Sequence, residues 1–281
     1  MKEELQAFEK TKDFLVCIDS DGCVLDTMDV KHMRCLGPCL VHVWGLGEFK
    51  DEILRLWRKV NLMGCGRGAN RFSGLAAVLE DIQDNYMRVE GLDGYLDWVK
   101  NAEELSPQNL EKAYEKTGNV CMKKALEWSV LVNQSMVMIS DKRKQPFDGA
   151  EEALRIAEEN ADVVIVTAAN GSEIRKEWEA FDIYKYTDLL MSQETGVKSE
   201  CLKGLLEKGY MPDHVIMIGD APADLEAAEA AGVLFYPVIA YQERKSWRMF
   251  PEVVERFTAG TYAGEYQDAL ITEFKKNLGI D

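Results

Sequence analysis

The chain has 281 residues, 47% of them hydrophobic and 29% charged, which is the balance of an ordinary globular protein that can bury a core. Its formal net charge of −16 repels nucleic acid and anionic membranes, so neither is expected as a partner. No run reaches the roughly 18–20 apolar residues that a membrane-spanning helix needs, and the charged start MKEELQAFEK does not have the pattern of a secretory signal.

The seven cysteines are scattered and include no CxxC pair. We therefore expect reduced, buried thiols and a cytoplasmic protein. The three histidines (His32, His42 and His214) do not pair with cysteines at zinc-ligand spacing, which argues against a zinc site.

The first predicted strand is the apolar run Phe14–Ile18. Further apolar runs predict strands later in the chain, at Val163–Val166, Leu189–Met191, Val215–Ile218 and Val233–Val238. Pro237 in the last run indicates a strand end or an edge strand. Amphipathic segments between these runs predict the helices Ala150–Asn160, Glu173–Ala180 (capped by Ser172), Glu200–Lys208 and Ala223–Ala231. Strands that alternate with helices predict a parallel sheet covered on both faces.

The region from Met28 to Gln145 has a different character, because it carries helical patterns and no convincing strand. The predicted helices are Val30–Trp44 (interrupted by Gly37-Pro38), Phe49–Val60, Gly74–Arg88, Leu92–Asn101, Pro107–Lys116 (capped by Ser106) and Val120–Ile139. We predict an α/β core formed by residues 1–27 and 146–281, with an all-helical domain of residues 28–145 inserted after the first strand. The segment after Ala240 is predicted to be helical.

Polar side chains of a particular kind stand at or near the ends of successive strands. In a parallel α/β sheet, sites form just beyond the carboxyl ends of the strands, so these side chains are expected to lie close together. They are Asp19, Asp21, Thr167, Lys198, Asp220 and Asp224. Four carboxylates, a hydroxyl and a lysine in this order indicate one active site.

This pattern resembles the haloacid dehalogenase-like (HAD) superfamily. The motif DxDG is present as residues 19–22, the strand-end threonine as Thr167, the lysine as Lys198, and GDxxxD as residues 219–224. The resemblance covers the predicted core and implies a Rossmann-like three-layer α/β/α fold. A helical insertion between the first and second motifs is similar to the caps of the β-phosphoglucomutase and phosphonatase relatives.

The resemblance implies a role for each motif residue. Asp19 would be the nucleophile that forms an aspartyl-phosphate, and Asp21 the general acid and base. Thr167 and the Ala168 backbone N–H would hold the phosphoryl oxygens, and Lys198 would stabilise the charge of the transition state. Mg²⁺ is the implied cofactor, with the Asp19 carboxylate, the Asp21 carbonyl and the Asp220 carboxylate as ligands and with Asp224 in a supporting position.

These roles predict a phosphohydrolase that acts on a small phosphorylated metabolite. Haloacid dehalogenases resemble the chain less, because they lack an acid at the position of Asp21. A phosphomutase of the β-phosphoglucomutase type and a non-catalytic binding protein on the same scaffold are the alternatives. A phosphonatase would need a cap lysine for a Schiff base, and Lys59 is the nearest candidate. Neither the substrate nor the oligomeric state follows from the motifs.

The stretch NLMGCGRGANRFSG, residues 61–74, is the most unusual part of the predicted cap. It resembles the specificity loop of the same relatives. Arg67, Asn70 and Arg71 are therefore candidates for contacts with the non-reacting part of the substrate, where arginine suits a phosphate or a carboxylate.

Each of these interpretations has a simpler alternative. Asp19 and Asp21 could form a turn, Thr167 could cap a helix, and Asp224 could be an ordinary first-turn acid. Lys203 competes with Lys198, and the glycine-rich stretch could be a plain connector. Two further groups of side chains are expected to be structural. They are the core tryptophans Trp57, Trp98 and Trp128 and the solvated basic cluster Arg244, Lys245 and Arg248.

Overall fold

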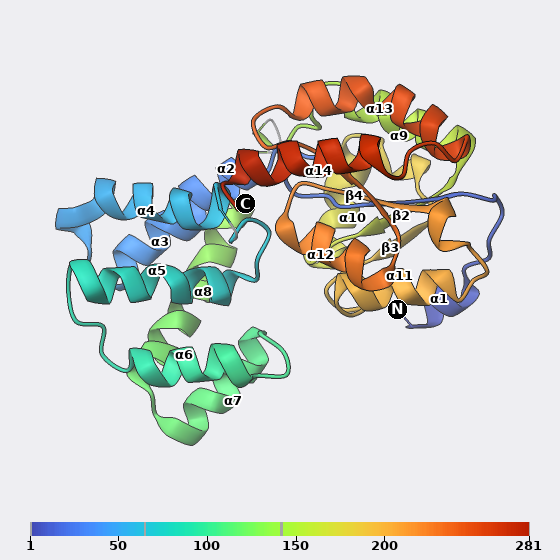
Figure 1. Ribbon diagram of the computed structural model, residues 1–281. Coiled ribbons are helices and arrows are strands. Elements are labelled where there is room, and N and C mark those ends of the chain that lie inside the picture. Colours follow the sequence, from blue (N-terminus) through green and yellow to red (C-terminus); the bar gives the residue numbers. More distant parts are fainter. Residues whose placement is uncertain (1, 65, 141–142, 281) are drawn as a thin grey trace. The chain divides into compact units, whose positions relative to one another are not determined.

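The computed structural model describes residues 2–64, 66–140 and 143–280, and the chain divides into two compact units. The first unit consists of Met1–Thr27 and Asp141–Asp281, and the second of Met28–Ser140 (Figure 1). The second unit thus ends at Ser140, whereas the sequence placed the boundary at Gln145. The segment from Gln145 onward belongs to the first unit because it bonds to the loop after the first strand. Asp26 N donates to Gln145 O at 2.8 Å, and Phe147 N donates to Val24 O at 2.9 Å.

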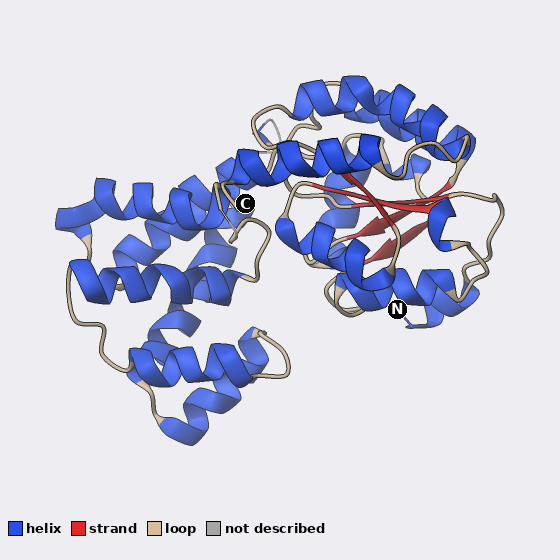
Figure 2. Cartoon of the chain, viewed as in Figure 1, coloured by secondary structure: helices blue, strands red, loops and turns tan. Residues whose placement is uncertain are grey.

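The first unit is built on five parallel strands in the order β3-β2-β1-β4-β5. Figure 2 shows these strands in red, with helices around them. The strands are β1 (Leu15–Ile18), β2 (Asp162–Val166), β3 (Leu189–Met191), β4 (Val215–Gly219) and β5 (Leu234–Pro237). All residues of β1, β2 and β4 are buried, which explains why they appear as continuous apolar runs instead of alternating patterns. Pro237 ends the edge strand β5, as its chemistry predicts.

Helices cover both faces of this sheet. The helices of the first unit are α1 (Lys2–Ala7), α9 (Ala150–Asn160), α10 (Gly171–Ala180), α11 (Lys198–Leu206), α12 (Pro222–Ala231), α13 (Glu243–Thr258) and α14 (Glu265–Leu278), with short 3₁₀ turns η4 (Tyr184–Tyr186) and η5 (Pro212–His214). Alternate strand residues pack into two separate cores. Helices α9, α10 and α13 contribute to one core, and α11, α12 and α14 to the other. The fold is the predicted three-layer α/β/α arrangement, and the chain after Ala240 supplies one helix to each outer layer.

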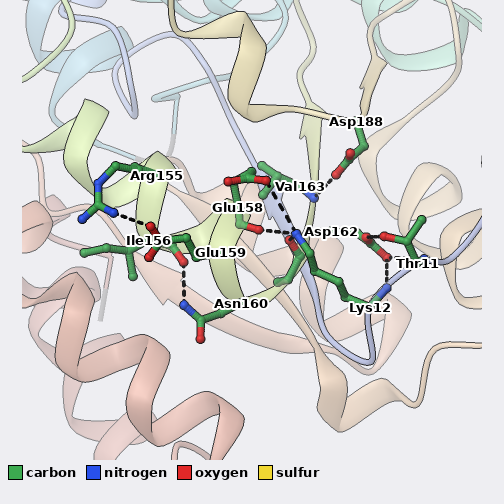
Figure 3. A network of polar contacts seen from close by, with 11 residues as sticks. Thr11, Lys12, Arg155, Ile156, Glu158, Glu159, Asn160, Asp162, Val163 and Asp188 are labelled. Atoms are coloured by element: carbon green, nitrogen blue, oxygen red, sulfur yellow. Dashed lines mark hydrogen bonds and ion pairs between the residues drawn. The ribbon is translucent and has the colours of Figure 1, made fainter.

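Asp162 fastens the amino end of β2 to the segment that precedes β1 (Figure 3). Its carboxylate accepts hydrogen bonds from Thr11 N at 2.9 Å, Thr11 Oγ1 at 2.5 Å and Lys12 N at 3.0 Å. The Tyr210 hydroxyl also donates to it. Burial raises the pKa of this carboxyl, but the hydrogen bonds outweigh burial and hold the pKa below its usual range. Asp162 is therefore an ionised group at the end of the sheet opposite the motif residues.

All regular elements among the described residues of the second unit are helices, as predicted. They are α2 (Met28–Lys31), η1 (His32–Leu36), α3 (Gly37–Val43), η2 (Gly47–Phe49), α4 (Lys50–Leu62), α5 (Arg71–Asn85), α6 (Leu92–Asn101), α7 (Pro107–Thr117) and α8 (Val120–Val137). Ser106 caps α7, accepting from Asn109 N at 3.3 Å. Trp57, Trp98 and Trp128 lie in the core of this unit, as expected.

The sequence predicted an interruption at Gly37-Pro38, but the helical path continues through it. The five residues before Gly37 form the π-helix η1, and Gly37 N donates to His32 O. Pro38 follows at the second position of α3, where its fixed φ suits the first turn of a helix. Gly37 permits a close helix crossing, because a Cβ there would lie 2.9 Å from Leu54 Cδ2. Among the helices that the structure describes, none is long and apolar enough to cross a membrane.

Candidate active site

The DxDG segment lies at the carboxyl end of the central strand β1. Ile18 pairs with Ile165 of β2 and with Ile218 of β4, so Asp19 emerges between the ends of two neighbouring strands. Asp19 N continues the ladder by donating to Ile218 O at 2.9 Å. Gly22 then adopts a φ of 82°, which favours glycine, and the chain folds back on itself. β2 and β3 lie on one side of β1, and β4 and β5 lie on the other, so the order of the strands changes direction at β1. α/β proteins bind ligands at such a position.

Lys198 lies between two carboxylates from different motifs. Its Nζ is 3.0 Å from Asp19 Oδ2 and 2.5 Å from Asp224 Oδ1, and all three side chains are almost fully buried. Burial raises the pKa of Asp19, Lys198 lowers it and Asp224 raises it, with a net result of about 6. Burial lowers the pKa of Lys198, but the two carboxylates outweigh it and hold the pKa well above its usual range. The lysine is therefore a fixed buried cation beside the Asp19 carboxylate. Lys203, its competitor in the sequence, has no such contact among those described.

The GDxxxD segment holds Asp220 and Asp224 at the end of β4. Asp224 Oδ2 accepts from Ala221 N at 3.0 Å while its Oδ1 accepts from Lys198, so both of its oxygens have partners. A Cβ at Gly219 would lie 2.3 Å from Asp224 Cγ and Oδ2, which only glycine avoids. The glycine of the motif is thus required by the close approach of the Asp224 carboxylate.

A cluster of carboxylates in this site has the chemistry of a metal site. Asp19, Asp220 and Asp224 are all buried, and each offers an oxygen within 4.8 Å of the others. Buried carboxylate oxygens are hard ligands that suit a divalent cation such as Mg²⁺, and the metal would compensate their negative charge. Both oxygens of Asp224 already have hydrogen-bond donors, in Lys198 and Ala221, whereas Lys198 contacts Asp19 through Oδ2.

Thr167 is buried at the end of β2. Its N–H donates to Met191 O at 2.9 Å, and its Oγ1 accepts from Ala169 N at 3.2 Å. The intervening residue, Ala168, is exposed at the same edge of the sheet. Neither Thr167 nor Ser172 caps the following helix, because Asn170 does so: its Oδ1 accepts from Ser172 N and Glu173 N. Asparagine is a preferred residue at this position, because its side-chain oxygen can accept hydrogen bonds from the free amides of the first helical turn.

Asp21 has a partner that sequence analysis did not identify. The Thr27 hydroxyl donates to Asp21 Oδ1, and Thr27 is fully buried while Asp21 is half-buried. The spacing Asp–x₅–Thr within one turn-rich segment was the available signal. Ser20, between the two acids, has a second unforeseen partner in Trp178, whose Nε1 donates to Ser20 Oγ at 2.8 Å. No local pattern connects positions 20 and 178, so only the fold could reveal that pair.

The three candidate residues of the helical unit occupy different settings. Arg67 is 3% exposed, and its Nη1 donates to Leu62 O at 3.2 Å. Asn70 caps α5 by accepting from Phe72 N, and its Nδ2 donates to Leu105 O at 2.9 Å. The loop is shorter than predicted, since α4 runs to Leu62 and α5 begins at Arg71. Apolar spacing does not detect such helix ends, where capping decides the boundary.

Arg71 is therefore a helical residue, and its Nη1 donates to Asn133 Oδ1 at 2.7 Å. Asn70 and Arg71 thus each have a structural contact within the helical unit. Cys65 of the same loop lies outside the described residues. The basic cluster Arg244, Lys245 and Arg248 is exposed and paired with the carboxylates of Asp148 and Glu273.

Solved structures share this fold at low sequence identity. A haloacid dehalogenase-like family hydrolase from Xanthomonas campestris is 13% identical, with 90% of this chain and 97% of that chain covered and a TM-score of 0.53. A protein from Lactobacillus delbrueckii subsp. bulgaricus, described as a phosphoglycolate phosphatase, is 16% identical, with 80% and 85% covered and a TM-score of 0.50. These likenesses establish the fold alone. A search of curated proteins gave no match.

A family model identifies the chain more directly. The model of the haloacid dehalogenase-like hydrolases matches residues 95–238, just over half of the chain. The matched segment contains Thr167, Lys198 and the GDxxxD motif, while the DxDG motif precedes it in the sequence and joins it in space at the carboxyl end of β1. The chain belongs to the haloacid dehalogenase-like hydrolases.

Proposed function

We propose that the protein is a Mg²⁺-dependent phosphohydrolase that acts on a small phosphorylated metabolite through Asp19. The observation that supports this best is the buried ion-pair arrangement in which Lys198 Nζ lies 3.0 Å from Asp19 Oδ2. A buried carboxylate at a strand end, held beside a fixed cation and close to other metal-binding oxygens, suits attack on a phosphoryl group.

In this proposal the Asp19 carboxylate attacks phosphorus and forms an aspartyl-phosphate. Asp21 donates a proton to the leaving-group oxygen, then removes one from the water that hydrolyses the intermediate. Thr167 Oγ1 and the Ala168 N–H bind phosphoryl oxygens, and Lys198 balances the charge that develops on them. Asp224 keeps Lys198 in place. The Asp19 carboxylate, the Asp21 backbone carbonyl and Asp220 would hold Mg²⁺, which neutralises negative charge between the carboxylates and the phosphate.

A local concentration of positive charge reconciles an anionic substrate with a net charge of −16. Lys198 is buried among carboxylates and remains protonated, and the metal adds charge at the same place. The repulsive field of distant surface acids is screened beyond about 8–10 Å at physiological salt, so a small ester can approach. We further propose the helical unit as the cap that selects the substrate. Contacts of Arg67, Asn70 and Arg71 with the non-reacting part of the substrate stay predictions.

The test is hydrolysis of an aryl phosphate and of a panel of phosphorylated metabolites, with Mg²⁺ and with EDTA. Asp19→Asn is compared with Glu229→Gln, which removes one exposed charge from α12 in the same unit. We expect activity that requires Mg²⁺, is kept by Glu229→Gln and falls at least about 1,000-fold in Asp19→Asn, since covalent catalysis is lost. Full activity in Asp19→Asn would refute the proposed nucleophile.

The phosphomutase alternative uses the same residues and differs only in the acceptor of the phosphoryl group. Product analysis separates the two, because hydrolysis releases inorganic phosphate and a mutase returns an isomeric phosphate ester. Folded protein that binds Mg²⁺ but converts no ester would instead favour the non-catalytic binding protein.

A further inference from the structure

Two loops at the carboxyl edge of the sheet lie side by side next to the proposed phosphate site. One follows β2 and carries Thr167 and Ala168. The other follows β3 and leads to Lys198. Backbone hydrogen bonds join them, from Thr167 N to Met191 O at 2.9 Å and from Gln193 N to Ala169 O at 3.1 Å.

Glu194, in the second loop, fastens the two loops together with its side chain. Its Oε2 accepts from Gly171 N at 3.1 Å and from Ser192 Oγ at 2.6 Å. Its Oε1 accepts from the Asn170 side-chain amide. Both carboxylate oxygens therefore have donors, and two of the donors belong to the residues that directly follow the Thr167 loop. Partial burial raises the pKa of Glu194, but the hydrogen bonds lower this pKa by more than burial raises it. The carboxylate is therefore ionised at neutral pH.

Asn170 makes this contact while it also determines the start of α10. Its Oδ1 accepts from Ser172 N at 3.1 Å and Glu173 N at 3.2 Å, and its Nδ2 donates to Glu194. The Glu194 charge thus lies at the amino end of α10, where a carboxylate is favourable. The start of α10, the loop that follows β2 and the loop that follows β3 are thus connected through the Glu194 carboxylate.

Gly171 indicates how closely the two loops approach. A Cβ at this position would lie 2.7 Å from Ser192 Oγ, closer than real Cβ contacts allow. Ser192 is itself 3% exposed, so it has little room to move. The two loops are therefore in close contact at Gly171, and Glu194 accepts hydrogen bonds from both sides of this contact, from Gly171 N and Ser192 Oγ.

We propose that Glu194 is a positioning residue that holds the Thr167–Ala168 loop against the Lys198 loop, and so sets the geometry of the phosphoryl-binding groups. The proposal rests on the proposed function, since it concerns the site at which the phosphoryl group would bind. Glu194 is an exposed acid beside an anion site, where its charge alone would weaken phosphate binding. Its contribution is therefore through geometry, because its charge acts in the opposite direction.

The experiment measures phosphate binding apart from turnover. Calorimetric titration with inorganic phosphate in the presence of Mg²⁺ is carried out on the full chain and on three variants. Glu194→Gln replaces one of the two accepting carboxylate oxygens by an NH₂ group. Asn170→Ser removes the amide donor but keeps a helix-capping oxygen. Glu229→Gln is the matched surface control. Hydrogen exchange of the amides in residues 167–171 and 192–197 is measured on the same proteins, and KM and kcat are measured with the best ester.

The expected result is a Kd for phosphate raised about five- to tenfold in Glu194→Gln and in Asn170→Ser, as for the loss of about one charged hydrogen bond. KM rises more than kcat falls, and exchange increases in both loops. The phosphate Kd of the double variant is no higher than that of Glu194→Gln, because Asn170 acts on the two loops through its contact with Glu194. Glu229→Gln behaves as wild type.

Three results would contradict the proposal. An unchanged phosphate Kd in Glu194→Gln with only a lower melting temperature assigns the residue a purely structural role. Additive effects of the two substitutions show that they do not act through one contact. A wild type that binds phosphate but hydrolyses no ester refutes the proposed hydrolysis, while the Kd comparison still decides on Glu194. A wild type that does not bind phosphate refutes both.

Discussion

The Trp178 indole Nε1 donates a hydrogen bond to Ser20 Oγ at 2.8 Å, and both side chains are fully buried. Ser20 lies between the proposed nucleophile and the proposed general acid. A second indole holds the same loop, since Trp247 Nε1 donates to Cys23 O at 3.0 Å. Two core tryptophans on helices of one face thus define the path of the loop that carries both acids.

Ser20→Ala should lower both stability and kcat. It leaves the Trp178 N–H buried without an acceptor, at a cost of about 1–3 kcal/mol in the free energy of unfolding. Denaturation and kinetics of Ser20→Ala, Trp178→Phe and the double variant form a mutant cycle. A shared hydrogen bond predicts a double variant that is less impaired than the sum of the singles, whereas strict additivity would contradict it.

Thr27→Val should lower kcat with little change in KM. The valine cannot donate to Asp21, so the carboxylate loses the partner that orients it, and general acid–base catalysis contributes about 100- to 10,000-fold. We expect a loss of about 10- to 100-fold, since Asp21 itself remains. Thr27→Ser keeps the hydroxyl and should retain most of the activity. Equal losses in both variants would mean that the methyl group, and not the hydrogen bond, is needed.

Gly219→Ala should disable the site while the fold survives. The added Cβ would overlap the Asp224 carboxylate, which must move and release Lys198. A displacement of about 1 Å at a catalytic group costs about 100-fold in kcat/KM. Gly47→Ala is the matched control, because nothing lies within 4 Å of a Cβ there. Wild-type activity in Gly219→Ala would show that the contact between Gly219 and Asp224 is not needed for catalysis.

Asp162→Asn should destabilise the protein in a pH-dependent manner. The pKa of Asp162 is lowered in the folded state, so its ionised form contributes stability above the pKa of the unfolded chain, and this contribution is lost as pH falls through the folded-state pKa. At pH 7 we expect a loss of about 2 kcal/mol in the free energy of unfolding, since a charged hydrogen-bond acceptor is removed.

Urea denaturation from pH 7 down to pH 3 measures this effect, with the exposed Asp13→Asn as control. The difference between wild type and Asp162→Asn should shrink as the pH falls below about 4, the ordinary pKa of aspartate. A difference that stays constant with pH would mean that the effect comes from shape and not from charge.

The sequence by itself determined the fold class, the order of the strands along the chain and the helical character of residues 28–140. Apolar runs and helical spacing reflect burial, which is a local property of each element, so they can be recognised without a structure. The motif residues were identified for a related reason. The strands of a parallel sheet end at one edge, and four carboxylates, a hydroxyl and a lysine stand in order at or near these ends.

Only the tertiary structure decided which side chains contact one another across long stretches of the chain. Ser20 and Trp178 form a hydrogen bond although they are far apart in sequence, and Glu194 bridges the loops of two strands. Helix ends at Asn70 and Asn170 were also missed, because a cap depends on which oxygen reaches the free amides. Periodicity records which face of an element is buried, but a hydrogen bond depends on distances that the packing of all elements sets together.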